Sequence, residues 1–266
     1  MKVKQVNNYM AMLRNLNNIT KVGVSQHHID KVCAALTDVN AVEKSKQLPF
    51  RFFTAYKQLG GEYSIWAKSL EQAMTISCAN IPKLSGRTAI LVDTSGSMHS
   101  AISGKSSVQC VEIASLMGAM LHHVSNDNVV ITFDSDAFVV NQLIGESVLY
   151  DANMIWTSRN GGVTYLYKAL ELMIKQRIYV DRIIVLSDMQ TYGAQEKRYL
   201  DMYKNVGNPN VKTFTVDLQG YSHNSNTLGS DNVYQLAGYS DRIFNLIAAY
   251  DQDSAAIVNY IQNLVV

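Results

Sequence analysis

Residues 93–97, Asp-Thr-Ser-Gly-Ser, place three oxygen-bearing side chains at alternating positions directly after an apolar run. Asp93 would end a buried strand, with Ser95 and Ser97 in the loop that follows. Asp188 ends another apolar run in the same way, and Thr164 follows a glycine-containing turn and begins a predicted helix. Because ligands of open α/β sheets bind beyond the carboxyl ends of the strands, we expect these five side chains to meet at one edge.

The chemistry of this group suits Mg²⁺ or another divalent cation. Mg²⁺ prefers oxygen ligands in octahedral geometry and keeps several of its waters. Two carboxylates nearly cancel its charge, and three hydroxyls leave the coordination shell incomplete. Gly96 would let the loop fold tightly around the ion. The set therefore predicts a metal site that a carboxylate or phosphate oxygen from a partner completes.

The elements that position these residues alternate between strand and helix from residue 87 onward. The predicted strands are apolar runs rich in β-branched residues at 88–92, 128–133, 181–187 and 211–216. The predicted helices lie at 107–124, 164–176, 194–206 and 241–265. A short hairpin with its turn at 134–136 adds one antiparallel edge strand. This order predicts an open, doubly wound, mostly parallel α/β sheet.

The preceding residues 5–80 read as short helices. Tyr9, Met12, Leu13, Leu16 and Ile19 recur at three- and four-residue steps, which is one helical face. Further helical patterns lie at 25–38, where Ser25 is a candidate N-cap, at 48–59, where Pro49 can start a helix, and at 64–80. We therefore divide the chain into a helical appendage, 1–82, and an α/β domain, 83–266.

The Asp-Thr-Ser-Gly-Ser motif, Thr164 before Lys-Ala-Leu and Asp188 after an apolar strand resemble the metal-ion-dependent adhesion site of von Willebrand factor A domains. In that family two serines and a threonine bind the metal directly, and the aspartates act mostly through water. The resemblance assigns these roles to Ser95, Ser97 and Thr164, and to Asp93 and Asp188. The family usually has Gly-Gly-Thr, whereas this chain inserts Val163 before the threonine.

A second resemblance covers essentially the whole chain. The stretches "MAMLRNLNNITKVGV" and "LPFRFFTAYKQL", followed by an A-type domain with "LSDMQTYG", are similar to the carboxyl-terminal half of the Ro autoantigen (TROVE) family. Members of that family form a ring of helical repeats that binds misfolded and small structured RNAs. Most of that ring has no counterpart here, so no RNA-contacting residue is carried over.

Charge and composition narrow the function classes. The net charge of +1 divides into +7 over residues 1–92 and −6 over residues 93–266. A basic amino-terminal part is either a solvated face or a surface that attracts phosphate. Three cysteines without metal-like spacing, no signal peptide and no apolar run long enough for a membrane span predict a cytoplasmic protein.

Competing interpretations of the motifs are weaker. A helix N-cap explains one residue of 93–97 but not the matching positions of Thr164 and Asp188. The Gly-Lys-Ser at 104–106 lacks the glycine that a phosphate loop needs, because position 99 is His99.

We place His99 at the rim of the metal site and assign Asp134 and Asp136 to the hairpin turn. Met98 and Met189 are predicted to form an apolar rim for a partner.

We therefore predict a non-catalytic, metal-dependent binding module, because no activated nucleophile or acid–base pair is visible. The leading setting is a Ro-like ribonucleoprotein with RNA on the basic helices and an acidic protein ligand at the metal. The alternative is an assembly protein that binds an acidic partner or itself, without RNA.

Overall fold

The chain divides into two compact units in a computed structural model that describes residues 8–104, 106–158, 161–190, 195–220, 228, 231–240 and 242–252. The first unit comprises Met1–Ile81 and Glu146–Leu149, and the second comprises Pro82–Gly145 and Tyr150–Val266. Each unit has buried apolar residues of its own.

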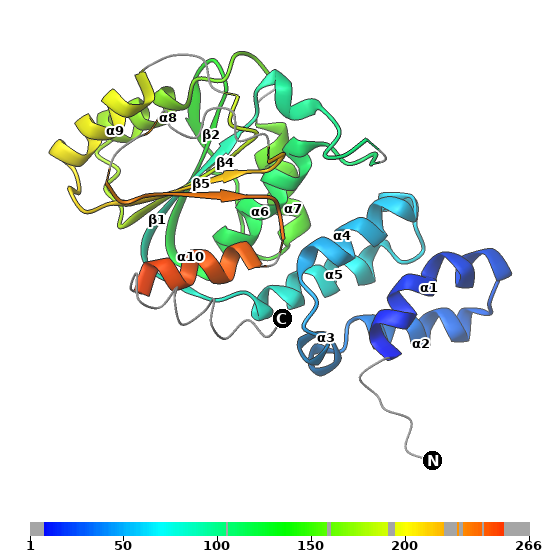
Figure 1. Cartoon of the computed structure of the whole chain (residues 1–266). Coiled ribbons are helices and arrows are strands. Elements are labelled where there is room, and N and C mark those ends of the chain that lie inside the picture. Colours follow the sequence, from blue (N-terminus) through cyan, green and yellow to red (C-terminus); the bar gives the residue numbers. More distant parts are fainter. Residues whose placement is uncertain are drawn as a thin grey trace. The chain divides into compact units, whose positions relative to one another are not determined.

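The first unit is built from short helices (Figure 1). They are α1 (Asn8–Val22), α2 (Gln26–Leu36), α3 (Val39–Ser45), α4 (Pro49–Gln58) and α5 (Ala67–Ser77), with 3-10 turns at Gly61–Tyr63 and Cys78–Asn80. Leu16, Leu36, Phe52 and Trp66 are fully buried, so the apolar faces of these helices pack on one another. The indole nitrogen of Trp66 donates to Thr20 Oγ1 at 2.8 Å.

Two details of this unit differ from the sequence prediction. Helix α3 was not predicted, because seven residues are too few to show a helical period; Asp38 begins it by accepting a hydrogen bond from Ala41 N at 2.7 Å. Ser25 lies at the N-cap of α2 but makes no capping bond, and its hydroxyl instead lies 2.8 Å from His28 Nδ1.

The second unit is a six-stranded sheet in the order β3-β2-β1-β4-β5-β6. The strands are β1 (Leu84–Asp93), β2 (Ser125–Phe133), β3 (Ala137–Val139), β4 (Arg182–Ser187), β5 (Lys212–Asp217) and β6 (Val233–Ala237). All neighbouring pairs are parallel except β2 and β3. The predicted mostly parallel, doubly wound α/β class is therefore confirmed, including the antiparallel edge strand.

Helices cover both faces of this sheet (Figure 1). They are α6 (Cys110–Val124), α7 (Val148–Thr157), α8 (Leu166–Lys175), α9 (Gln195–Val206) and α10 (Arg242–Gln252), with a 3-10 turn at Gly96–His99. On one face, Leu170 of α8 and Tyr203 of α9 join Leu91 and Val185 in a buried cluster. On the other, a Cβ on Gly118 of α6 would lie only 3.0 Å from Val92 Cγ2, so the glycine allows α6 to approach the sheet closely.

Three elements of the second unit depart from the sequence prediction. Strand β6 and helix α7 were not predicted, and α6 begins at Cys110 rather than at residue 107. Strand β6 is an edge strand whose residues are partly buried or exposed, and it lacks an apolar run like that of β4. The predicted last helix at 241–265 is described as α10 over Arg242–Gln252, and its remainder lies outside the described residues.

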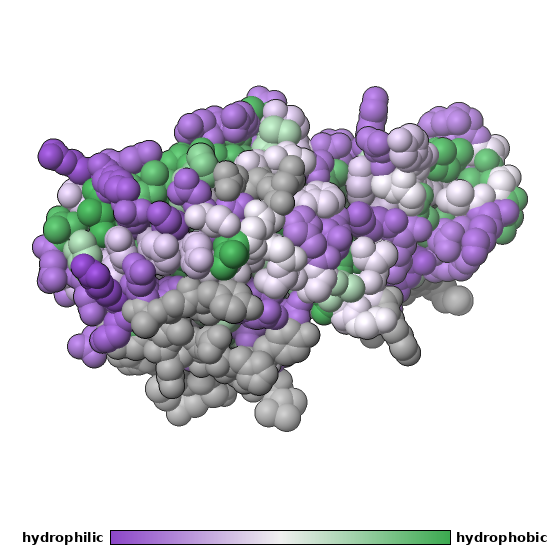
Figure 2. Space-filling model, turned by 90° about the horizontal axis from the view of Figure 1, so that it is seen from above, coloured by the Kyte–Doolittle hydropathy of each residue, from purple (hydrophilic) through white to green (hydrophobic). Residues whose placement is uncertain are grey.

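Within the part of the chain that the structure describes, no helix has both the length and the apolar character needed to cross a membrane. On the face shown in Figure 2, hydrophobic patches are interspersed with hydrophilic residues.

Candidate metal centre

The three predicted hydroxyl groups lie side by side although they come from two separate loops. The Thr164 hydroxyl donates a hydrogen bond to Ser95 Oγ at 2.8 Å. Ser95 Oγ lies 3.3 Å from Ser97 Oγ. Ser95 and Thr164 are buried, whereas Ser97 is partly exposed. The structure therefore forms a continuous row of three hydroxyls that reaches from the interior to the surface.

The two predicted carboxylates lie at the ends of adjacent parallel strands. Asp93 ends β1, is fully buried, and accepts hydrogen bonds from Ser95 N at 2.9 Å and from the Ser187 hydroxyl at 2.5 Å. Asp188 directly follows β4, is 1% exposed, and accepts a hydrogen bond from Gln190 N at 3.2 Å through Oδ1. Its Oδ2 is buried and has no hydrogen-bond partner among the described residues.

Burial makes the charged forms of both carboxyl groups unfavourable. Desolvation raises the pKa of Asp93 to about 7, although hydrogen bonds from Ser187 and Ser95 oppose the rise. Burial also raises the pKa of Asp188, the nearby Ser97 hydroxyl lowers it, and the charge of Asp217 raises it further. The charge of Asp188 also raises the pKa of Asp93. A nearby cation would stabilise the ionised form of both carboxyl groups.

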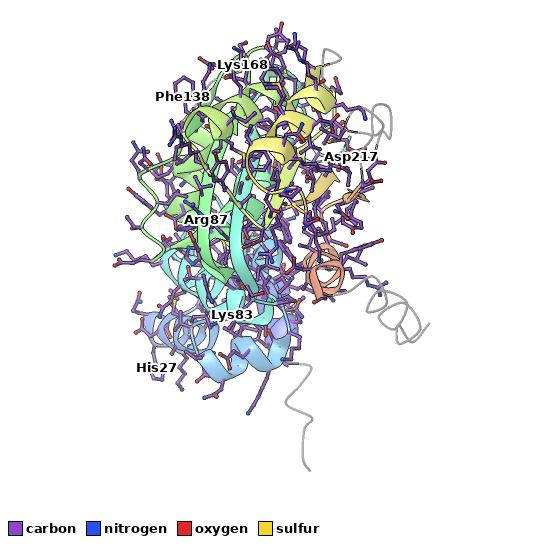
Figure 3. All side chains as sticks on the ribbon, turned by 90° about the vertical axis from the view of Figure 1, so that its left-hand side faces the viewer. His27, Lys83, Arg87, Phe138, Lys168 and Asp217 are labelled. Carbon is purple, nitrogen blue, oxygen red and sulfur yellow. The ribbon has the colours of Figure 1, made fainter. Side chains whose placement is uncertain are left out.

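The order of the strands explains why these groups meet. The chain passes from β1 to β2 on one side and later returns to β4 on the other, so β1 lies at the switch point of the sheet. The loops after β1 and β4 diverge there and leave a crevice at the carboxyl ends. Figure 3 shows Lys168, shortly after Thr164, at the end of this unit opposite to Lys83, which precedes β1.

Two glycines bring the Thr164 loop against the Ser95 loop. Gly162 O accepts a hydrogen bond from Gly96 N at 3.0 Å. Gly162 has a φ of +137°, and a Cβ there would lie 2.5 Å from Ser135 Oγ. The same Ser135 oxygen accepts a hydrogen bond from Val163 N at 3.0 Å. The Val163 side chain is 42% exposed, so the inserted residue points outward and Thr164 still reaches Ser95.

The site opens to the surface through a hollow of about 460 Å³. It is lined by Ser97, Gly162, Val163, Thr164, Tyr165 and Gln190. The hydroxyl row is thus accessible to a group that arrives from outside.

The methionines that flank the motifs do not line this opening. Met98 is fully buried and Met189 is only 4% exposed, so the predicted apolar rim is wrong. Both side chains turn into the interior; Met189 does so with a positive φ of 59°, while its N–H donates to Ser187 Oγ at 2.9 Å. His99 is partly exposed, in keeping with a rim position.

Asp134 and Asp136 form the hairpin turn, as predicted. Asp134 is fully buried and accepts a hydrogen bond from Asp136 N at 3.1 Å. Its backbone carbonyl accepts from Tyr165 N at 3.0 Å, which fixes the start of α8 beside the site. The hairpin turn therefore helps to hold the Thr164 loop in place.

Sequence reasoning missed Ser187, Ser135 and Asp217. Ser187 is the last residue of β4 and orients Asp93, and Ser135 seats the Gly162 turn. Asp217 ends β5 and acts on Asp188 through its charge. A polar residue at the carboxyl end of a neighbouring parallel strand was the signal available for Ser187 and Asp217; none was available for Ser135.

The donor set fits a hard divalent cation. Among the residues that the structure describes, no group of three His, Cys, Asp or Glu side chains is placed to hold a metal ion. The candidate donors are three hydroxyls and two carboxylates, and Asp188 Oδ2 among them has no hydrogen-bond partner in the described part of the chain. These are the oxygen ligands that Mg²⁺ and Mn²⁺ prefer.

Comparisons with known proteins agree with this architecture. A family model described as TROVE domain matches residues 5–61, and one described as Ro60 vWA domain matches residues 87–250. The "Telomerase protein component 1" of Rattus norvegicus is 45% identical over 51 residues, which are 19% of this chain and 2% of that protein. Its Mus musculus counterpart is 41% identical over 51 residues, with the same shares.

Among solved structures, the Deinococcus radiodurans RO (RSR) protein superimposes with a TM-score of 0.73 at 20% sequence identity. The match covers 93% of this chain and 53% of that protein. The chain thus spans about half the length of this relative, and the likeness shows a shared fold.

Proposed function

The chain belongs to the Ro family, and we propose that it is a Ro-like, RNA-binding ribonucleoprotein component that also holds a partner through a divalent cation. The Ro60 vWA domain model matches residues 87–250, which are more than half of the chain, and the TROVE model matches most of the helical unit. The proposed role is binding rather than catalysis.

The metal part of this proposal rests chiefly on two features: the row of three hydroxyls, and Asp188 Oδ2, which is buried and has no hydrogen-bond partner among the described residues. An orphaned, buried carboxylate oxygen is costly unless a cation compensates it. Ser95, Ser97 and Thr164 would bind Mg²⁺ directly. Asp93 and Asp188 would supply negative charge and would contact the ion mostly through bound water molecules. The bound ion would supply a Lewis-acidic position that accepts one more oxygen.

The proposed occupant of that position is a carboxylate of an acidic protein ligand. The hollow over Ser97 and Thr164 leads to the site from solvent. Because this unit carries excess negative charge, an acidic ligand would be repelled in the absence of the cation. Partner binding should therefore require the metal.

A Mg²⁺-dependent shift in thermal stability tests the site. The wild-type protein should unfold at a higher temperature in Mg²⁺ than in chelator, because a ligand that binds only the folded state stabilises it, by about 2.7 kcal/mol at one hundred times its dissociation constant. The double variant Ser95→Ala/Ser97→Ala should lose this shift. Ser85→Ala, at an exposed serine of the same unit, should keep it. An equal shift in all three proteins would contradict the proposal.

The RNA part of the proposal rests on the family and on charge. The basic excess lies in residues 1–92, and electrostatic attraction dominates the affinity of proteins for nucleic acid. A filter-binding titration with a structured RNA across salt concentrations tests it. An RNA affinity that falls steeply with rising salt supports RNA binding. No measurable affinity would contradict it and favour the alternative function, an assembly protein whose helices and metal site bind protein partners only.

A further inference from the structure

An open pocket of about 190 Å³ lies between helices α1 and α4 of the first unit. Its floor is apolar and includes Leu13, which is 5% exposed. Its rim is polar and is formed by Arg14 and Asn17 from α1 and by Arg51, Thr54 and Gln58 from α4. Figure 1 shows both helices within the first unit.

The spacing of these residues places them on facing stripes. Arg14 and Asn17 are three residues apart on α1, and Arg51, Thr54 and Gln58 follow at steps of three and four on α4. Side chains with these spacings share one face of a helix. The contact between the Tyr9 and Phe52 rings, with centroids 6.2 Å apart, joins the two helices elsewhere along their lengths.

The two arginines have no counter-ion within the described part of the chain. Neither Arg14 nor Arg51 makes an ion pair or a side-chain hydrogen bond with a described residue, and both are exposed. Helices α1 and α4 contain no aspartate or glutamate at all. The side-chain amides of Asn17 and Gln58 likewise have no described partner. The rim is therefore rich in unused donors and free of acids.

We propose that the pocket formed by Arg14, Asn17, Arg51 and Gln58 binds a backbone phosphate of RNA. A guanidinium offers two parallel N–H groups that match the oxygens of a phosphate, and amide groups add neutral donors. The apolar floor suits the adjoining sugar. The volume of about 190 Å³ suits a group of the size of a phosphate with part of its sugar. This inference rests on the proposed RNA binding and assigns it a location.

Binding of the full chain to a single-stranded oligouridylate and to an RNA hairpin, measured across salt, tests the assignment. Arg14→Gln/Arg51→Gln removes both guanidinium groups at exposed positions. It should weaken binding roughly tenfold or more and make the salt dependence shallower by about 0.7 per lost phosphate contact. The matched control Lys31→Gln/Lys44→Gln removes the same charge from exposed sites of the same unit outside the pocket. Its affinity should change by about twofold or less.

A conservative variant separates charge from geometry. Arg14→Lys/Arg51→Lys keeps both charges but loses the guanidinium fork, so its affinity should fall between those of the wild type and the Gln variant. In the unmodified protein, bound RNA should also protect Arg14 and Arg51 from phenylglyoxal, a reagent that modifies arginine. This readout does not depend on how any variant folds.

The outcomes distinguish the pocket from the function it serves. If the wild type binds RNA and the arginine-to-glutamine variant loses no more RNA affinity than the lysine control, the assignment of the phosphate to this pocket is overturned, whereas the proposed RNA binding stands. Unprotected arginines in the RNA complex would do the same. Failure of the wild type to bind either RNA would overturn the proposed function itself. Protection of the arginines by poly-L-glutamate as complete as that by RNA would reassign the pocket to an acidic polypeptide and overturn the RNA assignment.

Discussion

Thr164 Oγ1 lies 2.8 Å from Ser95 Oγ, although 69 positions separate the two residues in the chain. This contact joins the two halves of the candidate metal centre. Thr164→Val keeps the shape of the side chain and removes its hydroxyl, so affinity for Mg²⁺ should fall about tenfold or more. Calorimetric titration measures this affinity. Thr157→Val, at an exposed threonine of α7, is the control and should bind Mg²⁺ like the wild type.

Metal-free stability should depend on pH through Asp93. Its pKa of about 7 exceeds the ordinary value of 3.8, so between these values the folded state holds a proton that the unfolded chain has released. The contribution of Asp93 to the free energy of unfolding should therefore be largest below about pH 4, fall by roughly 2–4 kcal/mol up to about pH 7, and then level off. The raised pKa of Asp188 acts in the same direction.

Urea unfolding at a series of pH values, in chelator and in Mg²⁺, measures this dependence. Because the metal requires ionised carboxylates, its stabilising effect should grow over the interval in which metal-free stability falls. Asp93→Asn carries no ionisable group at this position, so it should flatten the metal-free profile and lose the response to Mg²⁺. A profile for Asp93→Asn identical to the wild type would exclude Asp93 as the titrating group.

Gly162→Ala should weaken both the fold and the metal site. The new Cβ would meet Ser135 Oγ at 2.5 Å in a backbone conformation that side chains rarely adopt. We expect a loss of about 1–3 kcal/mol in the free energy of unfolding and weaker Mg²⁺ binding, because the Thr164 loop must move. Gly238 also has a positive φ, but a Cβ added there would have no atom within 4 Å. Gly238→Ala should therefore lose stability through backbone strain alone and keep its metal affinity. Unchanged metal affinity in Gly162→Ala would show that the turn does not position Thr164.

Arg182→Met should reduce stability without affecting the metal. Arg182 is 2% exposed; it donates to Thr88 Oγ1 at 2.8 Å and to Asp251 Oδ1 at 3.1 Å, and it also pairs with Asp251 Oδ2. Removing it leaves a partly buried carboxylate unpaired, which costs about 3 kcal/mol. Chemical denaturation measures the loss, and Arg182→Met/Asp251→Leu should recover part of it. Arg182 is the first residue of β4, at the end of the strand opposite to Asp188, so a change in Mg²⁺ affinity would contradict the independence of this cluster from the metal site.

Much of the fold could be predicted from the sequence because its signals are local. The strands β1 and β4 each contain an uninterrupted apolar run, at 89–92 and 183–186, which is the pattern of strands buried on both faces. The edge strand β6 lacks such a run, and α3 is too short to show a period, so both were missed. Pairing with a neighbour, rather than its own composition, defines β6.

The candidate site was predictable to the extent that strand ends determine it. Asp93 and Asp188 each end an apolar run, and the topology of a parallel sheet brings such ends together. The contact of Ser135 with the Gly162 turn depends on the approach of two loops that no local pattern reports. The directions of Met98 and Met189 were predicted wrongly because position next to a site does not determine whether a side chain points outward.

A crystal structure of the protein grown in Mn²⁺, with anomalous scattering to locate the ion, tests the central claim most directly. The account predicts a single strong anomalous peak in contact with Ser95 Oγ, Ser97 Oγ and Thr164 Oγ1, at metal–oxygen distances of about 2.1–2.2 Å. A peak bound elsewhere, or no peak at these hydroxyls in Mn²⁺, would contradict it.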